Sequence, residues 1–269
     1  MPSVNIHTHS SFSDGTLAPW DVLKRAQMAG VEFFSLTDHD TVDGWINPDY
    51  SLDDYKLKTV CGIEISTNFH DNLHILGLGI DTGKKNFLSK LKKYKQRRIK
   101  RVEKIVEALK GLGMDISLEE LSIKDNFSYG RPHIADCLIK KHIIRNRKEA
   151  FQKYLGHEKQ AYVPSSGPSI EEAIKVIKEA GGYAVLAHPG AVKNLINLEE
   201  FKEMGLDGIE AFYPSHSGGV VRHFIEEAKK LSLFIVAGTD FHGPGSGRDD
   251  LRGFDIEETL MGKLRERFL

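Results

Sequence analysis

The sequence predicts an α/β fold built as a (β/α) barrel or a close relative of one. Seven short apolar segments alternate with amphipathic segments, and seven runs rich in His, Asp and Glu come where the apolar segments end. Side chains this far apart in sequence meet only if the fold gathers the strand ends, and a parallel barrel delivers them to one rim. A length of 269 residues accommodates one barrel-sized domain, or a domain with a modest insertion.

The seven apolar segments are short and nearly continuous, as in strands that are buried on both faces. They cover residues 4–6, 31–36, 59–63, 73–76, 183–186, 208–212 and 233–237. Helices are predicted in several of the intervals, and Pro19 is placed to open one that ends by Gly30. Ser169 caps another helix that Gly181 closes, and residues 220–230 show helical spacing. Strands that alternate with crossover helices are typical of a parallel sheet.

Residues 83–165 depart from the alternation of strands and helices, and their pattern predicts a basic helical insertion domain. Apolar side chains recur at three and four residues along 88–109, and residues 163–168 are typical of a linker. The segment holds 21 Lys+Arg and 9 Asp+Glu, a net charge of +12, whereas the remainder carries −13. We therefore expect a metal-binding barrel of residues 1–82 and 166–269, with residues 83–165 as a lid. In the alternative, these helices only pack against the barrel exterior.

The composition indicates no membrane segment. No run of about 18 apolar residues occurs, and the N-terminus enters a strand without the basic and apolar regions of a signal peptide. The only cysteines, Cys61 and Cys137, fit two buried thiols in a cytoplasmic protein better than a disulfide. We expect a cytoplasmic location and no obligatory protein partner.

Imidazole and carboxylate side chains at the ends of the predicted strands indicate a site for several metal ions. His7 and His9 lie two apart on one strand, so both side chains face the same side, as chelation of an ion requires. Asp14 follows on a loop that can turn a carboxylate back toward the rim, and the alternative is an ordinary Asp-Gly turn. His and carboxylate groups are the usual ligands of catalytic divalent metals. The further runs of this kind lie at residues 37–40, 62–64, 74–77, 187–189, 213–216 and 238–242.

These motifs resemble the PHP (polymerase and histidinol phosphatase) family over nearly the whole chain and in the family's order. The resemblance rests on His-Thr-His-Ser-Ser-Phe-Ser-Asp-Gly at 7–15, Thr-Asp-His-Asp at 37–40, Gly-Ile-Glu at 62–64, Ala-His-Pro at 187–189 and Gly-Thr-Asp-Phe-His at 238–242. Within the family, residues 11–16 and Gly-Arg-Pro-His at 130–133 resemble the branch of nucleoside 3′,5′-bisphosphate phosphatases and 5′–3′ exoribonucleases. The resemblance implies a distorted (β/α)7 barrel, which agrees with the seven predicted strands.

The resemblance also implies two to three divalent metal ions held by nine residues. The first ion would be bound by His7, His9, Glu64 and Asp240, the second by Glu64 as a bridge with His74 and His188, and the third by Asp14, His39 and His242. Some relatives have His in the place of Asp14, so occupancy of the third site is left open. His74 lies within a predicted strand, and its alternative is a core histidine. Sites of mixed nitrogen and oxygen ligands accept Mn²⁺, Fe²⁺ or Zn²⁺, and of these metals we expect Mn²⁺.

The implied ions supply the chemistry, because a hydroxide that bridges two of them can attack phosphorus in line with the leaving oxygen. Asp38 is expected to orient a ligand or shuttle a proton, and His216 to bind phosphate or protonate the leaving hydroxyl. Arg131 would hold a phosphate through its planar guanidinium, with Arg248 as a second candidate. The alternatives are a structural turn histidine at His216 and a surface arginine at Arg131.

The predicted function is a metal-dependent phosphoesterase that removes phosphate from nucleoside 3′,5′-bisphosphates or trims the 5′ end of short RNA. The net charge of +12 in the insertion fits a nucleotide or short RNA better than a small amine-bearing ester such as histidinol phosphate. A histidinol-phosphate-type phosphatase is the alternative within enzymes. The alternative of another class is a nucleic-acid-binding accessory module, although all nine expected ligands are present and no polymerase-like region occurs.

Overall fold

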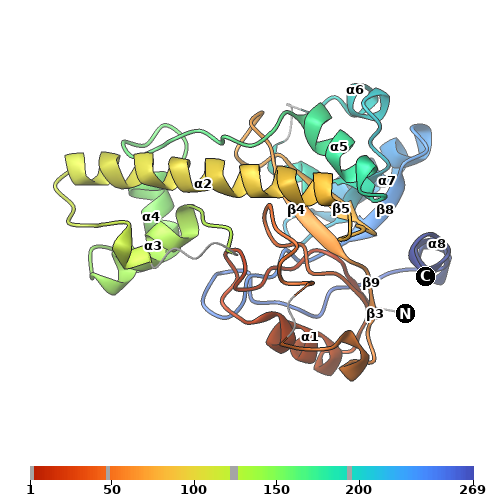
Figure 1. Ribbon diagram of the computed structural model, residues 1–269. Coiled ribbons are helices and arrows are strands. Elements are labelled where there is room, and N and C mark those ends of the chain that lie inside the picture. Colours follow the sequence, from red (N-terminus) through yellow and green to blue (C-terminus); the bar gives the residue numbers. More distant parts are fainter. Residues whose placement is uncertain (1–2, 47–48, 122–126, 193–195) are drawn as a thin grey trace.

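The computed structural model describes residues 3–46, 49–121, 127–192 and 196–269, and the parts of the expected domains between these ranges lie outside the described residues. The strands are β1 (Ser3–Asn5), β2 (Val31–Phe34), β3 (Lys58–Thr59), β4 (Gly62–Ser66), β5 (His74–Leu78), β6 (Tyr183–Leu186), β7 (Gly208–Phe212), β8 (Phe234–Ala237) and β9 (Phe254–Asp255). They form two sheets, with the orders β3-β2-β1-β9 and β4-β5-β6-β7-β8 (Figure 1). These sheets and the helices around them confirm the predicted α/β class.

All seven predicted strand segments contain strand residues, but the third of them is divided. Residues 59–63 span the end of β3 and the start of β4, which belong to different sheets. Two isolated parallel bridges link the sheets: Thr8–Phe241, beyond the ends of β1 and β8, and His39–Glu64, between the segment after β2 and the strand β4. Among the described residues, the strands therefore do not form the single continuous ladder of a closed seven-stranded barrel.

β5 runs antiparallel to both of its neighbours, β4 and β6, where the sequence predicted a parallel sheet. Only a short connection, residues 67–73, joins β4 to β5. A parallel pair needs a crossover of about a dozen residues or more, so this connection closes a hairpin instead. The reversal pairs His74, at the start of β5, with Ser66 at the end of β4. His74 therefore reaches the rim from the beginning of its strand.

The helices follow the predicted apolar spacing and caps. Pro19 lies in the first turn of α1 (Pro19–Met28), and the Ser169 hydroxyl accepts a hydrogen bond from Glu172 N–H at the start of α5 (Ile170–Glu179). The others are α2 (Lys85–Gly111), α3 (Arg131–Lys140), α4 (Arg147–Ala150), α6 (Leu198–Glu203), α7 (Gly218–Lys230) and α8 (Glu258–Phe268), with a π-helical turn at Phe151–Leu155. Within the part of the chain that is described, no helix combines the length and apolar character needed to cross a membrane.

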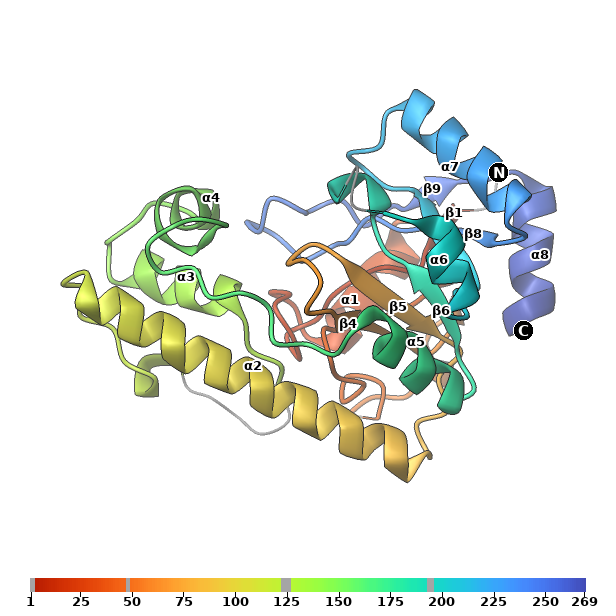
Figure 2. The ribbon, with the colours of Figure 1, turned by 90° about the horizontal axis from the view of Figure 1, so that it is seen from above.

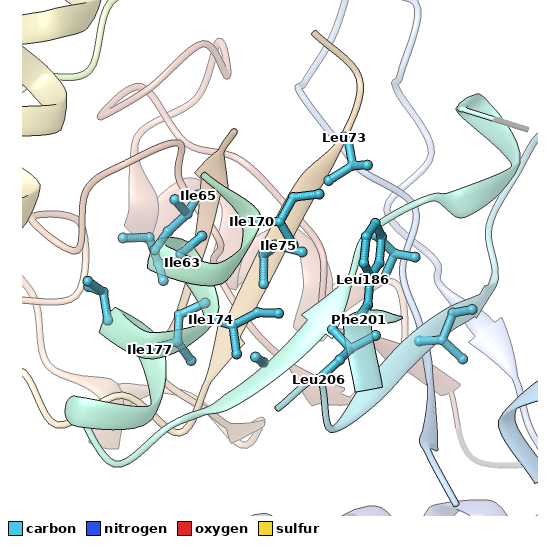
Figure 3. Close-up of a cluster of buried hydrophobic side chains, with 14 of the residues drawn as sticks. Ile63, Ile65, Leu73, Ile75, Ile170, Ile174, Ile177, Leu186, Phe201 and Leu206 are labelled. Atoms are coloured by element: carbon cyan, nitrogen blue, oxygen red, sulfur yellow. The ribbon is translucent and has the colours of Figure 1, made fainter. Parts of the chain in front are cut away.

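Four clusters of buried hydrophobic side chains occur among the described residues, and two of them use different parts of the chain. In the larger core one face of α5 packs against β4, β5 and their neighbours, and Figure 3 labels its side chains as Ile63, Ile65, Leu73, Ile75, Ile170, Ile174, Ile177, Leu186, Phe201 and Leu206. Burying one such side chain stabilises the fold by about 1.5–3 kcal/mol. The buried side chains of a second core all come from residues 102–161. Figure 2 shows the helices α3 and α4, which contribute to this second core, beside the C-terminal half of α2 and away from the sheets.

The two cysteines are both free thiols, as predicted. Cys137 packs in the second core, and Cys61 is partly buried beside the larger one. Burial raises the pKa of both thiols, which keeps them protonated and unreactive.

Candidate metal centre

All nine residues predicted to bind metal lie together at one rim of the sheets, and Glu64 is at their centre. This carboxylate is buried at the strand β4 and faces five imidazoles. The ring nitrogens around it are His7 Nε2 at 3.3 Å, His9 Nε2 at 3.2 Å and His39 Nδ1 at 3.1 Å from Oε2, and His74 Nδ1 at 2.7 Å and His188 Nε2 at 3.0 Å from Oε1. A carboxylate with different imidazoles on its two oxygens has the arrangement of a ligand shared between ions.

Eight of the nine expected ligands fall into three overlapping groups, each with its ligand atoms within 4.8 Å of one another. The groups are His7, His9, Glu64 and Asp240; His39, Glu64 and His74; and His9, Asp14, His39 and His242. His188, expected at the second ion, is in none of these groups, although its Nε2 lies 3.0 Å from Glu64 Oε1. The first group is the set expected for the first ion. His39 was expected at the third ion alone, but it presents Nδ1 to Glu64 at 3.1 Å and Nε2 to Asp14 at 3.8 Å. It therefore lies between two groups.

Several buried polar atoms of the cluster have no hydrogen-bond partner, which is the pattern of a metal site. They include His7 Nε2, His9 Nε2, His39 Nδ1, Asp14 Oδ1, Glu64 Oε2 and Asp240 Oδ1. An unpaired buried polar atom costs about 1–3 kcal/mol, so this concentration in one place is unfavourable without a ligand. Imidazole nitrogens and carboxylate oxygens directed at common points are the donors that divalent cations bind, so the residues fit the implied ions.

The carboxylates of the cluster are held in the charged form by neighbouring cationic groups, and they in turn favour the charged form of His9. Burial alone would lower the pKa of His9, but the adjacent carboxylates of Asp240 and Glu64 outweigh it and raise that pKa to about 9. Burial would raise the pKa values of Glu64 and Asp14, yet neighbouring histidines hold both well below their usual range. Against the same effect of burial, the Arg248 guanidinium is the main cause of the lowered pKa of Asp240. The carboxylates are therefore ready to bind cations.

Asp240 is oriented by two side chains from outside the ligand set. Its Oδ2 accepts hydrogen bonds from the Tyr213 hydroxyl at 2.9 Å and from the Arg248 guanidinium. This leaves Oδ1 facing His7 Nε2 at 3.5 Å and His9 Nε2 at 3.1 Å. The backbone φ of 54° at Asp240 is uncommon for a residue other than glycine, and such strain is concentrated at functional sites. Half of the Arg248 side chain is exposed, so further N–H groups are accessible to a substrate.

A cavity of about 380 Å³ opens beside the cluster and joins the two expected domains. Part of its lining consists of the ligand candidates Asp14, His39, His74 and His242. Its basic lining consists of Arg98, Arg101, Arg131, Arg147 and Lys148, all from residues 83–165, together with Arg248. The cavity therefore brings candidate metal ligands and guanidinium groups to the same space.

Arg131 lines this cavity as part of a three-residue ion cluster. Asp71 accepts hydrogen bonds from Arg131 Nη1 at 3.0 Å and from Arg101 Nη2 at 2.7 Å. The Arg131 guanidinium also lies 5.2 Å from the centre of the Phe151 ring. With 13% of its side chain exposed, Arg131 is not the surface arginine of the alternative reading. Asp71 holds two guanidinium groups close together, and sequence reasoning assigned no role to it.

Asp38 holds the loop that follows β1. Its carboxylate accepts hydrogen bonds from Ser10 N–H at 2.8 Å, from the Ser10 hydroxyl at 2.6 Å and from the Ser13 hydroxyl at 2.6 Å. The Ser13 oxygen lies in turn 3.4 Å from His9 Nδ1. Of the two roles expected for Asp38, this geometry favours orientation over proton transfer.

His216 has both ring nitrogens bound to backbone groups. Nδ1 donates to the Ala211 carbonyl at 2.9 Å, and Nε2 accepts from Gly190 N–H at 3.1 Å. Both nitrogens are thus in use before any substrate arrives. Of the readings that the sequence left open for His216, this geometry favours the structural turn histidine.

Known proteins resemble the chain over almost its whole length. The sequence profile of the PHP domain matches residues 5–185. A 3′,5′-nucleoside bisphosphate phosphatase of Chromobacterium violaceum is 31% identical over 261 residues, with 93% of this chain and 91% of that protein covered. The chain belongs to the PHP family.

Two further known proteins resemble the chain over nearly its whole length. A 5′-3′ exoribonuclease of Haemophilus influenzae is 32% identical over 265 residues, with 96% of each chain covered. A crystal structure from Bifidobacterium adolescentis, described as a candidate metal-dependent phosphoesterase, has a TM-score of 0.88 at 26% identity, with 100% of this chain and 98% of that chain covered. The predicted enzyme class, a metal-dependent phosphoesterase, is confirmed by these relationships.

Sequence reasoning missed one buried carboxylate of this PHP site, Glu210 in β7. Its Oε1 lies 3.0 Å from His7 Nδ1, and its Oε2 accepts the His188 backbone N–H at 2.6 Å. A carboxylate on the outer nitrogen of a ligand histidine fixes the ring's orientation and tautomer. The available signal was a lone glutamate inside the apolar segment 208–212, because an acidic residue in a strand buried on both faces requires a partner.

Proposed function

We propose that this PHP protein removes phosphate from nucleoside 3′,5′-bisphosphates or trims the 5′ end of short RNA. The observation that carries the proposal is one cavity lined by both candidate metal ligands and five basic side chains of residues 83–165. Both substrates carry phosphate at two positions, so one phosphate can lie at the metal groups while the basic lining holds the other. The names of the two curated relatives, one a bisphosphate phosphatase and one an exoribonuclease, support this substrate class.

Two to three divalent ions, with Mn²⁺ as the first candidate, would be held by the nine residues around Glu64. When bound, they would lower the pKa of a water molecule and neutralise phosphate charge. The protein's own groups prepare the site, because Tyr213 and Arg248 orient Asp240, and Glu210 directs His7 Nε2 toward Glu64. Burial of these ligands strengthens their electrostatic interactions.

The arginines of the cavity would divide the phosphates between them. Arg248, which donates a hydrogen bond to Asp240, would hold the phosphate that reacts. Arg131 and Arg101, held together by Asp71, would bind the phosphate that stays on the product. Residues 83–165 would thus be a basic lid domain on a distorted seven-stranded barrel formed by residues 1–82 and 166–269. Their own hydrophobic core supports this division.

A direct test compares substrates on the Mn²⁺-loaded protein. Phosphate release is measured from adenosine 3′,5′-bisphosphate and from histidinol phosphate, and shortening is followed on a 5′-phosphorylated RNA labelled at its 3′ end. We expect kcat/KM for the bisphosphate to exceed that for histidinol phosphate at least about tenfold, which corresponds to about 1.4 kcal/mol of transition-state binding. Asp240→Asn should abolish turnover, whereas Asp250→Asn, a matched change at a half-exposed aspartate, should not.

Each alternative has its own outcome in this test. Faster turnover of histidinol phosphate would identify the small-ester phosphatase instead. RNA binding that is unchanged by Asp240→Asn, with no turnover of any substrate by the parent protein, would identify an accessory module. Absence of phosphate release from the bisphosphate together with intact RNA overturns the proposal.

A further inference from the structure

The loop that carries Asp14 is bound by the helical segment, residues 83–165, through three successive backbone carbonyls. The three hydrogen bonds are Ser128 N–H to Phe12 O at 2.8 Å, His133 Nε2 to Ser13 O at 2.8 Å, and Arg147 Nη1 to Asp14 O at 3.3 Å. The Phe12 and Phe127 rings also stack at 4.8 Å. Donors that are spread over 20 residues of the helical segment thus meet consecutive residues of one short loop.

Two of these donors are themselves held in place. His133 lies in the first turn of α3, where its Nδ1 accepts a hydrogen bond from Gly130 N–H at 3.1 Å. That bond leaves the proton on Nε2, which donates it to Ser13 O. Asp136 binds Arg147 through two hydrogen bonds of 2.7 Å each, to Nε and Nη2, so only Nη1 reaches toward the loop.

The same loop is fixed on its other side by the sheet. Asp38, after β2, accepts the hydrogen bonds from Ser10 and Ser13 described above. Gly15 completes a tight turn in which an added Cβ would lie 2.5 Å from His9 O, so only glycine fits there. The position of Asp14 between these anchors is therefore set jointly by the sheet and by the helical segment.

Asp14 is the ligand candidate that depends most on this loop. His9, His39 and His242 follow strands closely, whereas Asp14 lies nine residues after the end of β1. Its Oδ1 is 3.2 Å from His242 Nε2 and 3.8 Å from His9 Nδ1. A metal site needs its ligand atoms held to within about 0.5 Å of their positions. Release of the loop would therefore move the Asp14 carboxylate away from the three histidines.

We propose that His133 and Arg147 are positioning residues for Asp14, and that the helical segment thereby controls whether the group of His9, Asp14, His39 and His242 binds its ion. The inference rests on the proposed function in taking this group as a metal site. Removing a partner that orients a ligand typically weakens metal binding by about 10–100-fold. The effect is expected on one ion and not on those bound around Glu64.

The test counts bound metal. The full-length protein is stripped with a chelator and dialysed against increasing free Mn²⁺, and the Mn²⁺ held per chain is measured by atomic emission. Asp14→Asn first identifies the binding step that belongs to this group. His133→Ala should weaken that step about 10–100-fold and leave the tighter steps within about twofold. His133→Gln, whose amide can replace Nε2–H, should restore most of the affinity, and His157→Ala, at an exposed histidine of the same segment, should match the parent.

Arg147→Gln serves as a second variant in case His133→Ala does not fold, and it should weaken the same step. The inference is overturned if this step is unchanged in both variants, or if the parent shows no step that Asp14→Asn removes. A loss spread equally over all steps and not restored by His133→Gln indicates a general structural role and also overturns it. Because the readout is metal binding, it is independent of whether adenosine 3′,5′-bisphosphate is hydrolysed.

Discussion

Glu210 accepts a hydrogen bond from His7 Nδ1, which lies 3.0 Å from Oε1 and 3.2 Å from Oε2, and this pairing turns the opposite ring nitrogen toward Glu64 and Asp240. A carboxylate can only accept, so the proton lies on Nδ1 and Nε2 keeps its lone pair for an ion. The second oxygen of Glu210 accepts the His188 backbone N–H at 2.6 Å. One buried carboxylate thereby places two ligand-bearing segments relative to each other.

Glu210→Gln should weaken Mn²⁺ binding without unfolding the protein. The amide has one acceptor oxygen where the carboxylate has two, so either His7 Nδ1–H or the His188 N–H would face an N–H group. We expect the affinity for Mn²⁺ to fall about 10–100-fold. Isothermal titration would measure this, with Glu227→Gln on the surface helix α7 as the matched control. An unchanged affinity would show that Glu210 does not orient His7.

Arg131→Gln should raise KM for adenosine 3′,5′-bisphosphate and leave kcat nearly unchanged. The removed guanidinium lies in the cavity, while Asp71 keeps its hydrogen bond from Arg101 and is not left unpaired. A hydrogen bond to a charged group is worth about 1.5–3 kcal/mol, so KM should rise about 10–100-fold. Steady-state kinetics would compare this variant with Arg97→Gln, at an exposed arginine of α2. Equal KM values for the two variants would place the second phosphate elsewhere.

Binding of Mn²⁺ should release protons at neutral pH. The pKa of His9 is raised from its ordinary value of 6.5 to about 9 because Asp240 and Glu64 outweigh the effect of burial. The protonated ring therefore stabilises the metal-free fold fully below pH 6.5, and this contribution is lost as pH rises through about 9. Since a metal ligand must be unprotonated, Mn²⁺ should displace this proton at about pH 7, and the affinity should increase with pH up to about 9.

Calorimetry in two buffers of different ionisation enthalpy would count the protons released. The heat should depend on the buffer at about pH 7, and the contribution of His9 should vanish at about pH 10. Proton release that is identical in a His9→Ala variant would assign the proton to another group.

His216→Ala should lower stability and leave the chemistry intact. The change removes the partners of the Ala211 carbonyl and the Gly190 N–H, and unpaired backbone groups of this kind cost about 1–3 kcal/mol. Urea unfolding should show this loss, while kcat and KM well below the unfolding temperature stay within about twofold of the parent values. His223→Ala, at an exposed histidine of α7, is the control for both measurements. A fall in kcat of more than about tenfold with normal stability would return His216 to the reacting groups.

Residue type and local spacing were sufficient to predict the strand segments and the His- and carboxylate-rich runs at their ends, whereas the nine-residue ligand set came from the resemblance to the PHP family. His7 and His9 alternate with Thr8 on one extended segment, so their shared direction follows from the period of a strand. β-Branched apolar segments bounded by glycine and polar residues identify buried strands in the same way. These inferences need only residues that are neighbours in the sequence, which is why they could be made without the structure.

Spacing alone could not determine which atoms meet across the chain. The hairpin that reverses β5 and brings His74 to the rim depends on a connection too short for a crossover. The pairing of Glu210 with His7 joins residues 203 positions apart, and the backbone groups that bind His216 come from the strand β7 and from the turn after β6. Such contacts depend on how the two sheets and the helical segment pack.

The sequence by itself therefore determined that His7, His9, Glu64, Asp240 and their partners form a cluster that suits metal, because strand ends gather at one rim in this kind of fold. Only the tertiary structure decided how each ligand is oriented. The partners that orient the ligands come from distant segments: Glu210 accepts a hydrogen bond from His7, Tyr213 and Arg248 donate to Asp240, and His133 donates to the loop of Asp14. Their strength depends on distances of a few tenths of an ångström, which packing sets and residue order does not encode locally.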